Sequence, residues 1–158
     1  MRFWESEVKK YERRVARIAA SPDPTKLASN RLLYQIMLDN RRMRLAAWDA
    51  GERFVYTGGG VPFRLVRAMG VHQCSPGFEG DRAVGSTDKY LGEVRRLGYP
   101  EYGCDRVMAG MGIVLSKELS PPVVAISGNY PCDPENYSAA ALATACGCPH
   151  YKLDIPTS

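Results

Sequence analysis

The chain has 158 residues, of which 45% are apolar and 24% are charged, and this is enough for one globular domain with a real core. The net charge of +4 is mild, and the basic residues crowd into the first 53 positions without forming a dense block, so we expect no nucleic-acid partner. The charged start, MRFWESEVKKYERR, lacks the apolar core of a signal peptide, and no window approaches the roughly 18 apolar residues of a membrane span, so we expect a cytoplasmic protein with no membrane partner.

Residues 1–50 are predicted to form an N-terminal helical segment. A first helix ends at SPDP, residues 21–24, because each proline removes a backbone donor, and a second helix is expected over residues 25–49, with Gly51 just past its end. The arginines of both helices form either a solvated face or a surface for a partner subunit. One apolar stripe at helical spacing supports the first helix: Val8, Tyr11, Val15 and Ile18.

Residues 51–158 are predicted to form an α/β domain. Short apolar runs alternate with helical stretches, which is typical of a parallel sheet flanked by helices. The run PPVVAISG is nearly continuously apolar, as expected of a strand covered on both faces. The segment 75–85 is expected to be a loop. Four strands are expected near residues 53–57, 71–74, 122–128 and 150–155.

Ligands of open parallel sheets bind beyond the carboxyl ends of the strands. Three segments are predicted to meet there: TGGGVP, SGNYPCDP and DIPTS. The glycines of TGGGVP permit a close backbone approach at a helix start, yet the segment matches no nucleotide-binding motif, so a tight strand-to-helix turn and a ligand contact are both open. The candidate substrate-binding residues are Gly58, Gly59, Gly60 and Pro62.

The five cysteines differ in their surroundings. A cytoplasmic protein rarely forms disulfides, and an odd count leaves one thiol unpaired. Cys74 and Cys146 end a predicted strand and a predicted helix, so we interpret them as core or near-core thiols. Cys104 and Cys132 each stand at a loop-to-helix junction, where the helix N-terminus favours the thiolate that ligates metal. These two cysteines are therefore candidate metal ligands.

The two histidines, His72 and His150, fall in predicted strands, where a structural role is the commoner one. The sequence contains neither the Ser-His-Asp order nor the H-E-x-x-H motif of hydrolases. Hydrolysis is therefore disfavoured.

Three stretches of the chain carry a resemblance to a known family. They are FVYTGGGVPFRLVRAMGVH, YPEYGCDRVMAGMG and PPVVAISGNYPCDPENYSAAALATACGCPHYKLDIP. In this order they resemble the N-terminal half of subunits of the 2-hydroxyacyl-CoA dehydratase and benzoyl-CoA reductase family, over roughly residues 50–156. The resemblance implies that residues 51–158 form the first Rossmann-like domain of such a subunit.

The resemblance also implies a cofactor and partners. Subunits of this family hold an oxygen-sensitive [4Fe–4S] cluster by three cysteines, and an ATP-dependent activator protein delivers one low-potential electron for a reaction on an acyl-CoA substrate. By motif, Cys104 and Cys132 match the first two cluster ligands. Thiolate ligation of this kind is consistent with the environment-tuned potentials of iron–sulfur clusters.

The sequence departs from the family at two places. The third ligand comes from a second α/β domain after the DIP strand, whereas this chain ends at Ser158, and a glutamate found in many members is replaced by Arg64. We therefore expect a fragment, a split subunit completed by a companion, or a degenerate paralogue, inactive on its own. The alternative hypothesis is a non-catalytic α/β module that binds a subunit or a small ligand and uses its thiols structurally.

Overall fold

The computed structural model describes residues 2–21, 29–83, 85–99, 103–129 and 132–154. The chain divides into two compact units, Met1–Glu52 and Arg53–Ser158, each of which is described by itself. The N-terminal part of the second helix expected at 25–49 and the end of the expected DIPTS segment lie outside the described residues.

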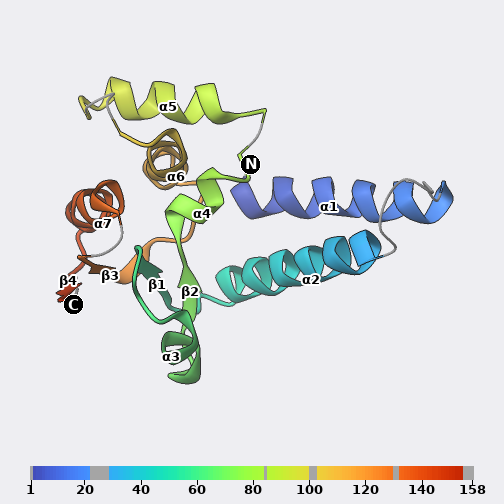
Figure 1. Cartoon of the computed structure of the whole chain (residues 1–158), viewed down its shortest axis with the longest axis horizontal. Coiled ribbons are helices and arrows are strands. Elements are labelled where there is room, and N and C mark those ends of the chain that lie inside the picture. Colours follow the sequence, from blue (N-terminus) through green and yellow to red (C-terminus); the bar gives the residue numbers. More distant parts are fainter. Residues whose placement is uncertain (1, 22–28, 84, 100–102, 130–131, 155–158) are drawn as a thin grey trace. The chain divides into compact units, whose positions relative to one another are not determined.

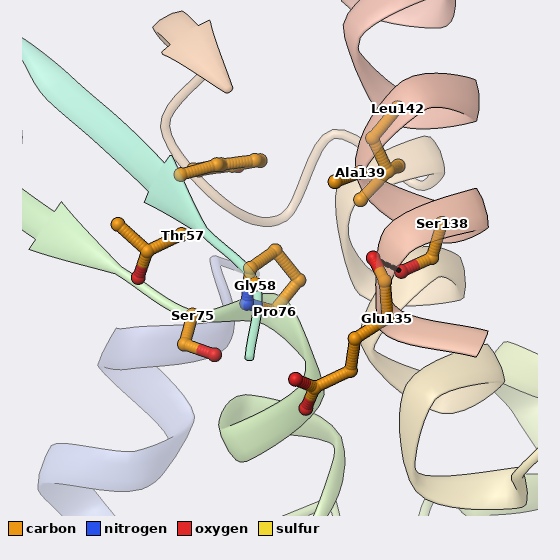
Figure 2. A pocket seen from close by; sticks show the side chains of 10 residues that line it. Thr57, Gly58, Ser75, Pro76, Glu135, Ser138, Ala139 and Leu142 are labelled. Atoms are coloured by element: carbon orange, nitrogen blue, oxygen red, sulfur yellow. Dashed lines mark hydrogen bonds between the residues drawn. The ribbon is translucent and has the colours of Figure 1, made fainter. Parts of the chain in front are cut away.

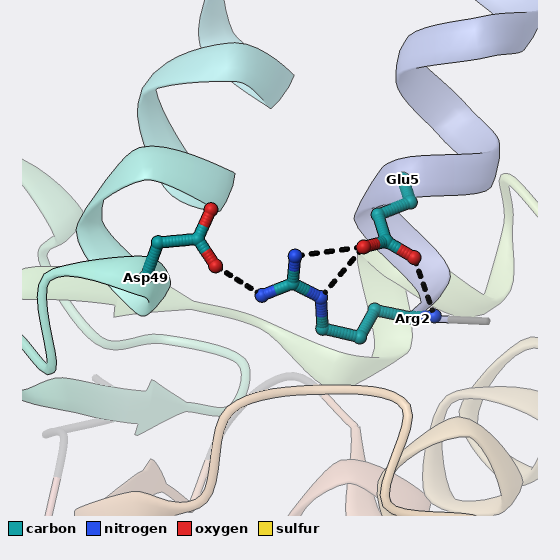
Figure 3. A network of polar contacts seen from close by, with 3 residues as sticks. All are labelled: Arg2, Glu5 and Asp49. Carbon is teal, nitrogen blue, oxygen red and sulfur yellow. Dashed lines mark hydrogen bonds and ion pairs between the residues drawn. The ribbon is translucent and has the colours of Figure 1, made fainter.

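The first unit is a pair of packed helices, α1 (Phe3–Ala20) and α2 (Ser29–Asp49). Aromatic side chains join them: the rings of Trp4 and Trp48 meet edge to face with centroids 5.7 Å apart. Figure 3 shows how Arg2, before α1, donates to Glu5 of its own first turn and to Asp49 at the end of α2. Because one guanidinium bonds both carboxylates, the start of α1 is fixed against the end of α2.

The second unit is built on a four-stranded sheet with the order β2-β1-β3-β4. Every strand pair is parallel, which confirms the parallel sheet predicted from the sequence. All four residues of the central strand β1 are buried, as expected of a strand paired on both sides. The strands are β1 (Phe54–Thr57), β2 (His72–Cys74), β3 (Pro122–Gly128) and β4 (His150–Leu153).

Helix α6 (Asp105–Leu115) is the most deeply buried helix described in this unit. Residues 107–114 are all buried, because α6 packs against α4 (Pro76–Gly80), α5 (Thr87–Arg96) and α7 (Asp133–Cys146), as Figure 1 shows. Glycines make these contacts possible. A Cβ added at Gly112 would lie 2.2 Å from the carbonyl oxygen of Tyr90, so the backbone of α5 lies directly against Gly112 of α6.

Two sequence-based expectations for this unit are wrong in detail. The segment 75–85 is not a plain loop, because it contains the short helix α4, which begins with Pro76 at its first turn and packs on α6. The helical pattern of CDRVMAGMGIVLSKEL, residues 104–119, predicts a helix up to Leu119, whereas α6 ends at Leu115. The contact of α4 with α6 is distant in sequence, and such contacts leave no local pattern.

The other helix boundaries follow the sequence signals. Helix α3 (Phe63–Ala68) starts after Pro62 and ends near Gly70, and α7 ends at Gly147 in the left-handed region that favours glycine. Helix α3 contacts β2, whereas α7 contacts β3 and β4. None of the helices in the described residues combines the length and the apolar character needed to cross a bilayer.

Candidate functional site at the carboxyl edge of the sheet

The candidate site lies at the carboxyl edge of the sheet, at the point where the strand order reverses. The chain adds β2 on one side of β1 and then β3 and β4 on the other side, so the carboxyl ends of β1 and β3 form a switch point. Ligands of open α/β sheets bind in the crevice at such points. The backbone closes the edge: the amide of Gly58 donates to the carbonyl of Ile126 at 2.8 Å, and the amide of Gly128 donates to the carbonyl of Gly59 at 3.0 Å.

A small cleft opens at this edge (Figure 2). Its empty volume, including its open mouth, is about 290 Å³. The ends of β1 and β2, the start of α4 and the first turns of α7 line it. Its polar groups are hydroxyls and one carboxylate, and its apolar wall comes from α7. The lining residues are Tyr56, Thr57, Gly58, Ser75, Pro76, Gly77, Glu135, Ser138, Ala139 and Leu142.

Gly58 is the predicted substrate-binding residue that lines this cleft. A Cβ added there would lie 3.3 Å from the Cβ of Ser127 and 3.4 Å from the carbonyl oxygen of Glu135, so any larger residue would require these neighbours to move slightly. Gly59 joins the hydrogen bonding of the edge, Gly60 takes a positive φ of 77°, and Pro62 precedes α3. A ligand contact by Gly58, Gly59, Gly60 and Pro62 stays a prediction.

Glu135 is the charged group of the cleft. It is buried, and its Oε1 accepts from the Arg106 guanidinium at 2.8 Å. Gly77 leaves room for this carboxylate, since a Cβ at Gly77 would lie 3.1 Å from the same oxygen. Ser138 donates its hydroxyl to the carbonyl of Glu135 at 2.9 Å, one turn further along α7. The Arg106 guanidinium thus bonds the carboxylate itself, whereas Ser138 bonds the backbone of the same residue.

The two predicted metal ligands are placed in equivalent positions. Cys104 is the N-cap of α6 and Cys132 is the N-cap of α7, and neither side chain makes a capping hydrogen bond. Helix α7 follows β3 and therefore begins at the carboxyl edge of the sheet, and the bond between Arg106 and Glu135 places the first turn of α6 beside the first turn of α7. Both thiols are free, with Cys104 exposed and Cys132 half-buried. Their role as ligands stays a prediction.

The donor chemistry of these two thiols fits half of an iron–sulfur site. Thiolate sulfur is the ligand that such clusters take, and cysteines free of disulfides and of capping bonds are available for it. Within the ranges that the structure describes, no group of three or more His, Cys, Asp or Glu side chains is arranged to hold a metal. A third ligand beside these two thiols would therefore have to come from outside the described residues or from another chain.

The other three thiols have different surroundings. Cys74, on β2, is fully buried, which agrees with its interpretation as a core residue. Burial, together with the neighbouring Cys148, raises the pKa of the Cys146 thiol, and burial also raises the pKa of Cys148. These thiols, at the C-terminal end of α7, are less able to form the thiolate that metal binding needs.

The histidines are engaged in contacts within the sheet. Nε2 of His150 lies 3.0 Å from the hydroxyl oxygen of Ser127, which is fully buried, and the ring of His72 lies against that of Phe54. Both contacts agree with structural roles for these residues.

Sequence reasoning missed Arg106 and Glu135 as parts of this site. One signal was present: each candidate cysteine is followed by an aspartate and then, two or three positions after the cysteine, by a second charged residue, which is Arg106 in CDR and Glu135 in CDPE. Their pairing across 29 positions needed the fold to be recognised.

The fold and its cleft define a four-stranded parallel α/β domain with a candidate ligand-binding edge. No protein-family model, no curated protein and no solved structure matches the chain.

Proposed function

We propose that residues 51–158 are the N-terminal cluster-binding domain of a 2-hydroxyacyl-CoA dehydratase or of a benzoyl-CoA-type reductase. Cys104 and Cys132 would hold one side of a [4Fe–4S] cluster, and a second domain or companion subunit would supply the third cysteine. The observation that carries the proposal is the equivalent placement of the two free cysteines, each before a helix that begins at the ligand-binding edge of the sheet.

The chain's own residues would prepare the site for this chemistry. Bound in place, the cluster would pass a single low-potential electron to an acyl-CoA thioester, as the family resemblance implies. Backbone amides at the starts of α6 and α7 favour negatively charged thiolates and the negative charge of a cluster. The glycines after β1 would let the thioester approach the edge closely, with Gly58 already lining the cleft.

Anaerobic reconstitution with ferrous iron and sulfide tests the cluster. The chain is reconstituted with and without an added small thiol that substitutes for the external ligand, and then with a companion domain. Iron and sulfide content, absorbance and electron paramagnetic resonance report the cluster. We expect Cys104→Ala and Cys132→Ala each to lose it, whereas the control Cys146→Ala retains it. Unchanged cluster content in the first two variants would exclude the assignment.

A second candidate function is a non-catalytic module that binds a small ligand or a subunit. It is favoured by the exposed apolar side chains on α3 and directly after it, because this short helix lies next to β2, whose end lines the cleft. These side chains are Phe63, Leu65 and Met69. If this function is correct, replacing all three by serine abolishes partner binding in pull-down, and Cys104→Ala has no effect on it.

A further inference from the structure

Arg106 joins three elements at the start of α6. Its guanidinium bonds Oε1 of Glu135 on α7 at 2.8 Å, lies 3.6 Å from Oδ2 of Asp81 just after α4, and stacks over the ring of Phe78 with its central carbon 5.3 Å from the centroid. Planar guanidinium groups are suited to such combined contacts, since the edge donates while the face stacks.

The contact with Glu135 joins the two helices whose N-caps are the candidate cysteines. Cys104 lies two residues before Arg106, and Cys132 lies three residues before Glu135. At about 1.5 Å of rise per residue, both cysteines stand less than one helical turn beyond the ion pair. A change in the distance between the starts of α6 and α7 therefore changes the distance between the Cys104 and Cys132 thiols.

The pair resists separation because Glu135 is shielded from water. Its side chain is 8% exposed, against 32% for Arg106, so removing the arginine would leave a buried carboxylate without this partner. Hydrogen bonds between ionised groups are shorter and stronger than neutral ones. Residues 106 and 135 thus hold the first turns of α6 and α7 at one spacing.

We propose that Arg106 and Glu135 are positioning residues that set the distance between the Cys104 and Cys132 thiols. This inference rests on the proposed function for its consequence, because a cluster tolerates only a narrow range of ligand spacing. The spacing itself is measurable without any cluster.

Cross-linking of the two thiols measures the spacing. The full chain is treated under reducing conditions with a bis-maleimide whose two rings are joined by a two-carbon linker, and the 104–132 cross-link is quantified by peptide mass spectrometry. We expect Arg106→Gln and Glu135→Gln to lower its yield by about three- to ten-fold, which lies in the lower part of the range that the coupling energies of contacting residues imply. Arg106→Lys, which keeps the charge, should restore most of it.

A matched control separates positioning from folding. Arg96 pairs with Glu93 at 2.7 Å within α5, so Arg96→Gln removes a similar ion pair that joins no second helix. It should leave the cross-link yield unchanged. The melting temperature and the alkylation of Cys104 alone are also recorded for each variant. A substitution that only destabilises the fold lowers the melting temperature but leaves the ratio of cross-linked to singly labelled thiol unchanged.

The outcomes distinguish this inference from the proposed function. If Arg106→Gln gives the same cross-link ratio as the unaltered chain, the positioning role is wrong, even where reconstitution yields a cluster that depends on Cys104 and Cys132. If the ratio falls but no such cluster forms, the positioning role stands and the cluster does not. No 104–132 cross-link in the unaltered chain would overturn both.

Discussion

Gly110 of α6 and Pro76 of α4 are in direct backbone contact: a Cβ added at Gly110 would lie 2.1 Å from the carbonyl oxygen of Pro76. The contact is reciprocal, since a Cβ at Gly80 would lie 1.9 Å from the carbonyl oxygen of Arg106. Helix α4 is therefore held against α6 through two glycines. The same contact places Ser75, Pro76 and Gly77 at the cleft.

We predict that Gly110→Ala destabilises the protein by about 3 kcal/mol, because backbone atoms cannot move aside as a flexible side chain can. Gly92→Ala is the matched control, since this exposed glycine of α5 has no atom within 4 Å of an added Cβ. That change should stabilise by about 0.5–1 kcal/mol through helix propensity. Urea unfolding followed by circular dichroism measures both, and equal effects of the two substitutions would contradict the packing described.

The start of α1 should loosen in acid. The Arg2 side chain and amide, by hydrogen bonding, hold the pKa of Glu5 below its ordinary value of 4.5. Because the folded pKa is lowered, the stability contributed by Glu5 is present above about pH 4.5 and is lost as the pH falls through and below it. We expect amide hydrogen exchange in α1 to be faster in Glu5→Gln than in the unaltered chain at pH 7.

The same difference should become smaller as the pH falls below 4.5 and Glu5 takes up a proton, and it should be reduced in 1 M salt, because exposed ion pairs are screened. Arg96→Gln serves as the control, since it removes an exposed pair in α5. A pH-independent difference in α1 would show that Glu5 acts by something other than its charge.

Because of Tyr56, we expect the free energy of unfolding to fall at alkaline pH. Burial raises the pKa of Tyr56 well above its ordinary value of 10.0, and its hydroxyl donates to the carbonyl of Ser120 at 2.7 Å. A raised folded pKa means that the contribution is complete below about pH 10 and is lost as the pH rises further. Tyr56→Phe should cost about 1–2 kcal/mol at pH 7 through the lost hydrogen bond.

Above pH 10 the difference in free energy of unfolding between Tyr56→Phe and the unaltered chain should become smaller. Tyr56 must stay protonated to remain buried, whereas phenylalanine has no proton to lose. Denaturant unfolding at pH 7, 9 and 10.5 measures the gap. A gap that widens with pH would contradict the sign of the linkage.

The five thiols should react at different rates with iodoacetamide. Cys104 is exposed, and Cys74 is fully buried, so we expect the first to be alkylated fastest and the second only after unfolding. Because burial raises the pKa of Cys146 above its ordinary 9.0, its alkylation rate should still be rising at pH 9.5. Peptide mass spectrometry over a pH series measures the rates, and rapid labelling of Cys74 in the folded chain would contradict its burial.

Local pattern was sufficient for most of the elements of this protein, but not for α4 or for the end of α6. The apolar run before Ser127 predicted a parallel strand, although Val123 is exposed rather than covered, and Gly51 predicted the end of a helix, because a positive φ restricts which residues a position accepts. The placement of Cys104 and Cys132 at helix starts followed from the same local signals.

Only the tertiary structure decided how these elements meet. The strand order, with β1 between β2 and β3, places Gly58 against Glu135, and no local period encodes which strands become neighbours. Helix α4 exists where glycines allow it to touch α6. The Arg106–Glu135 pair joins residues 29 positions apart, because ion pairs depend on distance in space, which the chain sets only after its core has packed.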